Sequence, residues 1–184
     1  VGLVPSVACF GVAGPVDNQT SQITNLPWQI SAGSIAERFN IGRVTLINDL
    51  ESIATAVPHL GSEELCTLNP GVAKSLGNIA VVAPGTGLGT AFLVWTGTRY
   101  KALASEGGHT SFAPRTAQEI DLLNYLRPRY RHVSFERICS GSHLPNIYEF
   151  LRDSGSYEEP GWLGTELAQV QDRTPVIVQA GMEQ

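Results

Sequence analysis

The chain has 184 residues, of which 42% are hydrophobic, and this composition is ordinary for a globular protein with a buried core. Lys and Arg number 12 against 17 Asp and Glu, and the resulting net charge of -5 argues against binding to nucleic acid or anionic membranes through bulk charge. The 3 cysteines, Cys9, Cys66 and Cys139, are far apart in sequence, which favours free thiols in a reducing compartment, the cytoplasm by default, over a disulfide framework.

The two ends of the sequence indicate a piece of a longer protein. Residues 1–16 are apolar but have no basic segment before them, and their Pro and Gly residues interrupt them far short of a membrane span. We therefore expect neither a signal peptide nor a membrane anchor there. The chain starts at Val1 without Met, and the helix-like pattern of residues 174–184 ends without a stop signal, so we expect a fragment.

The first part of the chain alternates strand and helix signals. β-Branched and apolar runs predict strands, and apolar residues at helical spacing predict helices. The predicted order is strand, strand, helix, strand and helix, over residues 7–16, 21–31, 34–40, 43–49 and the segment from 49 to 58. This order is typical of an α/β fold.

The strand of residues 43–49 ends in Asn48 and Asp49, directly before a helix. Asp is a favoured N-cap residue, because its carboxylate accepts hydrogen bonds from the first turn, so position alone predicts that Asp49 caps the helix. Ligands of open α/β sheets gather beyond the carboxyl ends of strands, so the same carboxylate is also well placed to meet a substrate. Both interpretations stay open.

Beyond residue 58 the sequence loosens and then becomes regular again. Residues 58–77 are rich in Pro and Gly and resemble a passage between domains, and residues 78–112 predict a meander of antiparallel strands. Helices are expected over residues 116–130, 134–141 and 143–154. In the first of these Thr116 is the expected cap, and the apolar face is expected to contain Ile120, Leu122, Leu123 and Leu126.

The glycine-rich stretch Ala83–Thr90 does not fit the common nucleotide motifs. A dinucleotide fingerprint needs a helix after the glycines and a P-loop needs Gly-Lys-Ser/Thr, whereas here a strand-like segment follows and Lys is absent. A hairpin remains whose N–H groups could form a nest for a phosphate, with Thr86 adding a hydroxyl. A plain tight turn is the alternative.

Three further polar residues are candidates for chemistry. Glu106 and His109 flank two glycines, which let a backbone approach a ligand closely, although a solvated Glu and a His satisfied by backbone would be equally ordinary. Glu136 follows Ser134, and its position alone predicts a capping-box partner or a surface acid. Cys139 and His143 are spaced i,i+4, but two residues do not make a zinc site, and we expect no metal ligands in this chain.

Taken together, several segments resemble the bacterial glucokinase family of the sugar kinase, Hsp70 and actin superfamily. The resemblance runs from about Val7 onward and rests on INDLESIATAVP, APGTGLGTAFLV, EGGHTSFAPRTAQEIDLLNYL, HVSFERICSG and LPNIYEFL, in this order. The related repressor and sugar kinase group usually has a cysteine-rich zinc motif after Glu-Gly-Gly-His. Here TSFAPRTAQEID follows instead, which favours the branch without zinc.

The resemblance implies roles for individual residues. Asn48 would bind sugar hydroxyls, and Asp49 would also bind the sugar and act as the catalytic base at its 6-hydroxyl. Glu106, His109 and Glu136 would complete the sugar pocket. Gly85, Thr86 and Gly87 would form the second phosphate loop of the superfamily.

The resemblance also implies an architecture and partners. The fold would be α/β of the ribonuclease H-like (actin-like ATPase) type, a two-domain sugar kinase fold here incomplete, with residues 1–59 in the small domain and 60–184 in the large one. The intact protein would be a cytoplasmic homodimer using glucose, ATP and Mg²⁺. The family's first phosphate loop, Asp-x-Gly-Gly-Thr, and its adenosine-cradling glycine segment are absent from this sequence, and His143 and Pro84 replace smaller residues.

Two other functions fit parts of the pattern. A sugar-binding regulator descended from a kinase would use the same pocket without turnover. A glycoside hydrolase would use Asp49 and Glu106 as its carboxylate pair, but this function leaves the glycine hairpin without a role.

Overall fold

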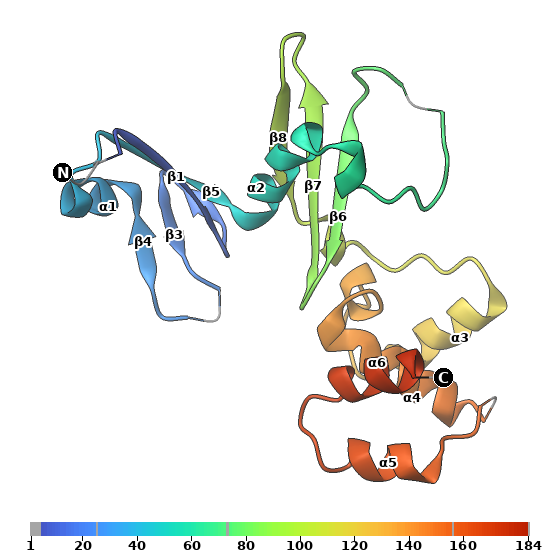
Figure 1. Ribbon diagram of the computed structural model, residues 1–184. Helices are drawn as coiled ribbons and strands as arrows, with labels where there is room; N and C mark the ends of the chain where they lie inside the picture. The colour runs from blue at the N-terminus through green and yellow to red at the C-terminus, as the bar shows by residue number, and fades with distance from the viewer. Residues whose placement is uncertain (1–4, 25, 73, 156, 184) are drawn as a thin grey trace. The chain divides into compact units, whose positions relative to one another are not determined.

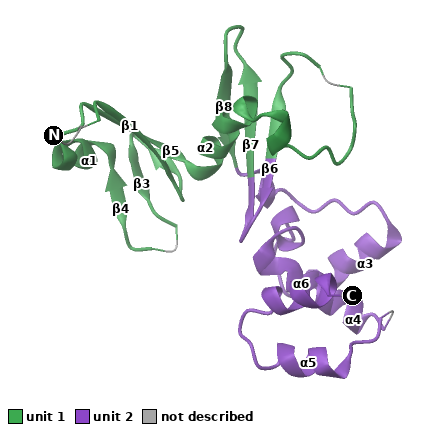
Figure 2. Cartoon of the chain, viewed as in Figure 1, with its two compact units in different colours: residues 1–81, 90–105 green, residues 82–89, 106–184 purple. Residues whose placement is uncertain are grey.

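A computed structural model describes residues 5–24, 26–72, 74–155 and 157–183 (Figure 1). The chain forms two compact units, unit 1 with residues 1–81 and 90–105 and unit 2 with residues 82–89 and 106–184 (Figure 2). This division differs from the boundary expected at residue 59, which stays a prediction about the domains of the intact protein. None of the helices among the described residues is long and apolar enough to cross a membrane.

A parallel pair of strands organises the first half of unit 1. Strand β1 (Val7–Val12) pairs with β5 (Arg43–Asn48), so that Val12 lies opposite Asn48 at the carboxyl end of both strands. Between them the chain forms a small antiparallel sheet and helix α1, with the bounds β2 (Val16–Asp17), β3 (Thr20–Gln22), β4 (Gln29–Ser31) and α1 (Ala32–Phe39). A parallel pair with a helix in its crossover confirms the α/β class.

The small antiparallel sheet corrects two expectations. The strand expected over residues 7–16 ends at Val12, because Gly14 has a φ of 152°, a conformation that breaks an extended run and that L side chains rarely adopt. The single strand expected over residues 21–31 is a hairpin of two very short strands. Such strands carry too few residues to show an alternating pattern.

The second half of unit 1 packs helix α2 (Asp49–Ala56) near a three-stranded sheet. The sheet order is β6-β7-β8, with β6 (Ile79–Pro84), β7 (Leu88–Trp95) and β8 (Tyr100–Ser105), and β7 runs antiparallel to β8. The meander is therefore confirmed. Ala54 of α2 is fully buried in a cluster with Ala91 and Leu93. The segment between α2 and β6 contains only the 3-10 turns Val57–His59 and Ser62–Glu64 among its described residues.

Unit 2 contains the turn between β6 and β7 and, from Glu106 onward, is mainly helical. The bounds are α3 (Ala117–Leu126), α4 (Leu144–Asp153), α5 (Gly161–Leu167) and α6 (Thr174–Met182). Thr116 caps α3 in a capping box with Glu119, as expected. The helix expected over residues 134–141 is wrong, since the chain forms the short 3-10 turn Phe135–Arg137 there and begins another, Gly141–His143, at the end of this range.

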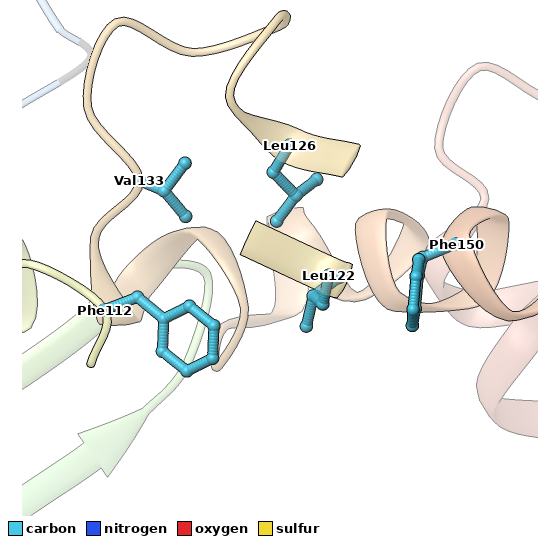
Figure 3. Close-up of a cluster of buried hydrophobic side chains, with 5 residues drawn as sticks. All are labelled: Phe112, Leu122, Leu126, Val133 and Phe150. Carbon is cyan, nitrogen blue, oxygen red and sulfur yellow. The ribbon is translucent and has the colours of Figure 1, made fainter. Parts of the chain in front are cut away.

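The core of unit 2 lies between α3 and α4. Leu122 and Leu126 of α3 lie in one buried cluster with Phe150 of α4, together with Phe112 and Val133 from the loops (Figure 3). Ile120 does not belong to this face and is 49% exposed. It stands two residues before Leu122, and residues at i and i+2 point away from each other on a helix.

Candidate active site

Helix α2, which follows β5, begins one residue earlier than the sequence implied. Asn48, not Asp49, is the N-cap, and its Oδ1 accepts hydrogen bonds from the N–H groups of Leu50 (3.0 Å) and Glu51 (3.4 Å). Asn48 is still paired in the β-ladder and has extended torsions, so the first helical residue is Asp49. The expectation that Asp49 caps the helix is therefore wrong.

The side chains of Asn48 and Asp49 differ in how much of their hydrogen-bonding capacity is committed. Nδ2 of Asn48 donates to the carbonyl of Gly14 (3.1 Å), which ties the end of β5 to the turn after β1. Oδ1 of Asp49 accepts from the N–H of Leu50 (2.8 Å). Oδ2 of Asp49 makes no hydrogen bond to the described residues, so one carboxylate oxygen is available for a substrate.

The Glu-Gly-Gly-His segment forms a 3-10 turn, Gly107–His109, at the start of the helical part of unit 2. Nε2 of His109 lies 3.7 Å from Oε2 of Glu106, and both side chains are largely exposed. The turn needs a glycine at its centre, because a Cβ on the buried Gly108 would lie 2.1 Å from the carbonyl oxygen of Leu88. The turn that carries Glu106 and His109 therefore packs directly against Leu88, the first residue of β7.

Glu136 joins this group from a distant part of the sequence. Its Oε2 accepts a hydrogen bond from the N–H of Leu88 (3.0 Å), and its Oε1 lies 3.8 Å from Nδ1 of His109. The side chain is only 20% exposed. The capping-box role expected from its position is wrong, since the hydroxyl of Ser134 makes no capping hydrogen bond. Unit 2 therefore brings Glu106, His109 and Glu136 together.

The glycine hairpin adjoins the same carboxylate. Gly85 donates its N–H to the carbonyl of Gly87 (2.9 Å), and the carbonyls of Gly85 and Thr86 accept from Gly141 (2.7 Å) and Ser142 (3.1 Å). Among the described residues the N–H groups of Thr86 and Gly87 find no acceptor, as a phosphate nest requires. The hairpin is fixed through its carbonyls and keeps these two donors available.

A cavity of about 760 Å³ lies beside the hairpin within unit 2. Its lining combines Gly85 and Thr86 with Gly141, Ser142 and the helix α6, where Thr174 donates its hydroxyl to the carbonyl of Gly141 (2.7 Å). Thr174 and Gln179 were not identified from the sequence. The only local signal was the helical pattern of residues 174–184, which indicates a helix but gives no reason to expect a ligand.

We expect Gly108→Ala to lower the free energy of unfolding by about 1–3 kcal/mol, the usual cost of an added methyl group without space. The methyl would meet the Leu88 carbonyl, which is backbone and cannot rotate away. Gly71→Ala is the matched control, because a Cβ there meets nothing within 4 Å. Urea unfolding of both variants measures the difference, and equal stability would contradict the close approach.

The sequence matches a known family over almost its full length. The family model described as "Glucokinase" matches residues 3–184. The glucokinase of Nostoc sp. (strain PCC 7120) is 41% identical over 151 residues, which are 81% of this chain and 44% of that protein. The glucokinase of Synechocystis sp. (strain PCC 6803) is 43% identical over 148 residues, or 79% of this chain and 42% of that protein. The chain thus spans less than half the length of these relatives.

Glucokinases are also among the solved structures whose fold is similar to that of this chain. A glucokinase from an Antarctic psychrotroph superposes with a TM-score of 0.74 at 32% identity, covering 93% of this chain and 55% of that one. A Balamuthia mandrillaris glucokinase in complex with glucose has a TM-score of 0.62 at 21% identity, covering 97% of this chain and 57% of that one. The second likeness concerns the fold alone.

Proposed function

The chain belongs to the glucokinase family, and from this premise we propose that the intact protein transfers the γ-phosphate of ATP to the 6-hydroxyl of glucose. One observation carries the proposal beyond family membership. The Glu136 carboxylate binds the N–H that follows the glycine hairpin and also faces His109, so residues assigned to sugar and to phosphate are in contact within unit 2.

Carboxylates and a histidine are suitable ligands for a sugar. Each hydroxyl of glucose is both a donor and an acceptor, and hydrogen bonds to charged groups are the stronger ones. Glu106 and His109 are largely exposed and so remain free to exchange water for hydroxyl groups. Asn48 is also a proposed ligand of sugar hydroxyls, although its Oδ1 already accepts two helix N–H groups, which leaves Nδ2 as its freer group.

Asp49 is the proposed catalytic base. Phosphoryl transfer requires little covalent work from a protein beyond positioning, charge stabilisation and an acceptor for the hydroxyl proton. A carboxylate with an uncommitted oxygen, at the carboxyl end of a strand of a parallel pair, is suited to accept that proton. The helix N-terminus behind it favours the negative charge.

The donor side of the site fits a nucleotide phosphate. The N–H groups of Thr86 and Gly87 and the hydroxyl of Thr86 would hold phosphate oxygens, and the adjoining cavity has room for more of the nucleotide. ATP bound there would supply the phosphoryl group. For Mg²⁺ the fit is incomplete, because no group of three or more His, Cys, Asp or Glu side chains among the described residues is arranged so that it could hold a metal ion. The ligands of Mg²⁺ would then come from other parts of the intact protein.

The remaining parts of the proposal concern the intact protein. Its α/β fold would be of the ribonuclease H-like, actin-like ATPase type with two domains, the small one including residues 1–59. It would act as a cytoplasmic homodimer. The test of the function is a coupled assay of glucose-dependent ADP formation by the intact protein, in which glucose binding without turnover would instead indicate a sugar-binding regulator.

The 184-residue chain by itself should give no measurable phosphorylation in that assay. It contains the proposed base and sugar ligands but lacks the Asp-x-Gly-Gly-Thr loop, and catalysis of this kind consists almost wholly of positioning and electrostatic stabilisation. The intact protein is the positive control. Robust turnover by the chain alone would show that its residues form a complete nucleotide site.

A further inference from the structure

A compact polar cluster lies directly behind Glu136 in unit 2. Ser140 is buried and donates its hydroxyl to the backbone carbonyl of Glu136 (2.8 Å). Oγ of Ser140 also lies 2.9 Å from Nδ1 of His143, and Nε2 of His143 contacts Nη1 of Arg137. Arg137 directly follows Glu136 in the sequence. The cluster therefore contacts this short segment at two points, the carbonyl of Glu136 and the guanidinium of Arg137.

The hydrogen bonds determine which nitrogen of His143 carries the proton. A hydroxyl has one hydrogen, and Ser140 gives it to Glu136, so Nδ1 of His143 must be the donor to Ser140. Nε2 is then the acceptor for the Arg137 guanidinium, which is always protonated. His143 is therefore neutral and in its Nδ1–H form, linking Arg137 to the hydroxyl that holds the Glu136 carbonyl.

Two further residues immobilise Arg137. Its guanidinium lies over the ring of Tyr130, 4.6 Å from the centroid, and its backbone carbonyl accepts from Nδ2 of the buried Asn146 (2.8 Å). The hydroxyl of Tyr130 in turn donates to Oδ1 of Asn146 (3.1 Å). The ring of His143 packs edge-on against Tyr130. Arg137 is thus a fixed partner rather than a mobile surface cation.

We propose that His143 is a positioning residue that holds the Glu136 carboxylate in the sugar site by orienting Ser140 and Arg137. The inference rests on the function proposed above for Glu136. The Glu136 carboxylate makes two interactions at once: it accepts a hydrogen bond from the N–H of Leu88, and it lies close to the ring of His109. A shift of the Glu136 backbone would disturb both. His143 does not itself touch the sugar in this arrangement.

Protonation of His143 should weaken the cluster. Burial and the nearby Arg137 lower the pKa of His143 below its ordinary value, against a smaller opposite effect of Glu136. Tyr130 is the other titratable side chain that packs on the ring. Because the folded pKa is lowered, the contribution to stability is present above the ordinary pKa of about 6.5 and is lost as the pH falls through the folded value. A second ring N–H would then point at the guanidinium.

The experiment measures glucose affinity of the intact protein by calorimetry, with kcat and KM for glucose measured in parallel. His143→Gly should weaken glucose binding about 2- to 10-fold at about pH 8, the effect of one lost hydrogen bond, with a smaller change in kcat. His143→Asn keeps a donor toward Ser140 and should recover part of the affinity. The double variant with Ser140→Ala should bind no more weakly than the worse single variant, since both act through one chain of hydrogen bonds.

The pH profile separates positioning from a general loss of stability. The ratio of wild-type to variant affinity should be smaller at a pH below the lowered folded pKa of His143 than at about pH 8, because wild-type His143 then carries its proton and the variants have none to gain. His59→Ala, at an exposed position, should keep the wild-type profile. Variants that match a glucose-binding wild type at both pH values would overturn the role of His143 alone. A wild type that neither binds nor phosphorylates glucose would contradict the proposed function, and this inference with it.

Discussion

Replacing Asp49 by Asn in the intact protein should lower kcat by about 10²- to 10⁴-fold, the range typical of losing a general base. The amide keeps the size of the carboxylate and can still accept a hydrogen bond from the N–H of Leu50, but it cannot take up the proton of the 6-hydroxyl. The helix should remain intact, because its cap is Asn48. We therefore expect KM for glucose to change far less than kcat.

Glu51→Gln is the matched control for this experiment. Glu51 is the other acidic residue in the first turn of α2, so its substitution removes the same charge from the same helix N-terminus. This change should cost only the small loss of helix-dipole interaction, about 0.3–1 kcal/mol of stability, and leave kcat within a few-fold. Near-normal turnover by the Asp49 variant, or an equal loss in both variants, would show that Asp49 is not the base.

The sequence predicted the long elements of the fold and missed the short ones. Strand β5 and helix α2 each carry a clear apolar period, and the meander is marked by its glycine turns. The strands β2, β3 and β4 are too short to show alternation. They form because β2 pairs with β3 across a turn at Asn18 and Gln19, which both have positive φ, and β3 pairs in turn with β4. The cap of α2 was misassigned because Asn and Asp are both good caps, and the strand register that decides between them is a tertiary fact.

The site was predictable only in pieces. Local sequence gave Glu136 no role beyond helix capping, because its partner Leu88 is 48 residues away. Only the family resemblance singled it out. Helix α6 was expected as a helix, yet nothing in its sequence indicated that Thr174 and Gln179 would line the cavity beside the hairpin. A contact between distant segments leaves no periodic signal in either of them, and this explains both gaps.

Gly87→Ala should impair the use of glucose and ATP together, whereas Gly85→Ala should affect ATP alone. A Cβ on Gly87 would lie 2.7 Å from Oε2 of Glu136, and a Cβ on Gly85 would meet nothing within 4 Å. Neither glycine has a left-handed backbone, so the two variants differ in surroundings rather than in strain. Both methyl groups would hinder a phosphate approaching the hairpin, but only the one at residue 87 would displace the Glu136 carboxylate from the N–H of Leu88.

The size of the Gly87 effect follows from that hydrogen bond. Hydrogen bonds to charged groups contribute about 1.5–3 kcal/mol, so we expect kcat/KM for glucose to fall about 10- to 100-fold in Gly87→Ala and to stay within a few-fold in Gly85→Ala. Varying glucose at saturating ATP gives kcat/KM for glucose, and varying ATP at saturating glucose gives kcat/KM for ATP. Equal losses for glucose in both variants would mean that Glu136 acts independently of the hairpin. A loss confined to Gly87→Ala would mean that one carboxylate, held by the first N–H of β7, connects phosphate binding to sugar binding.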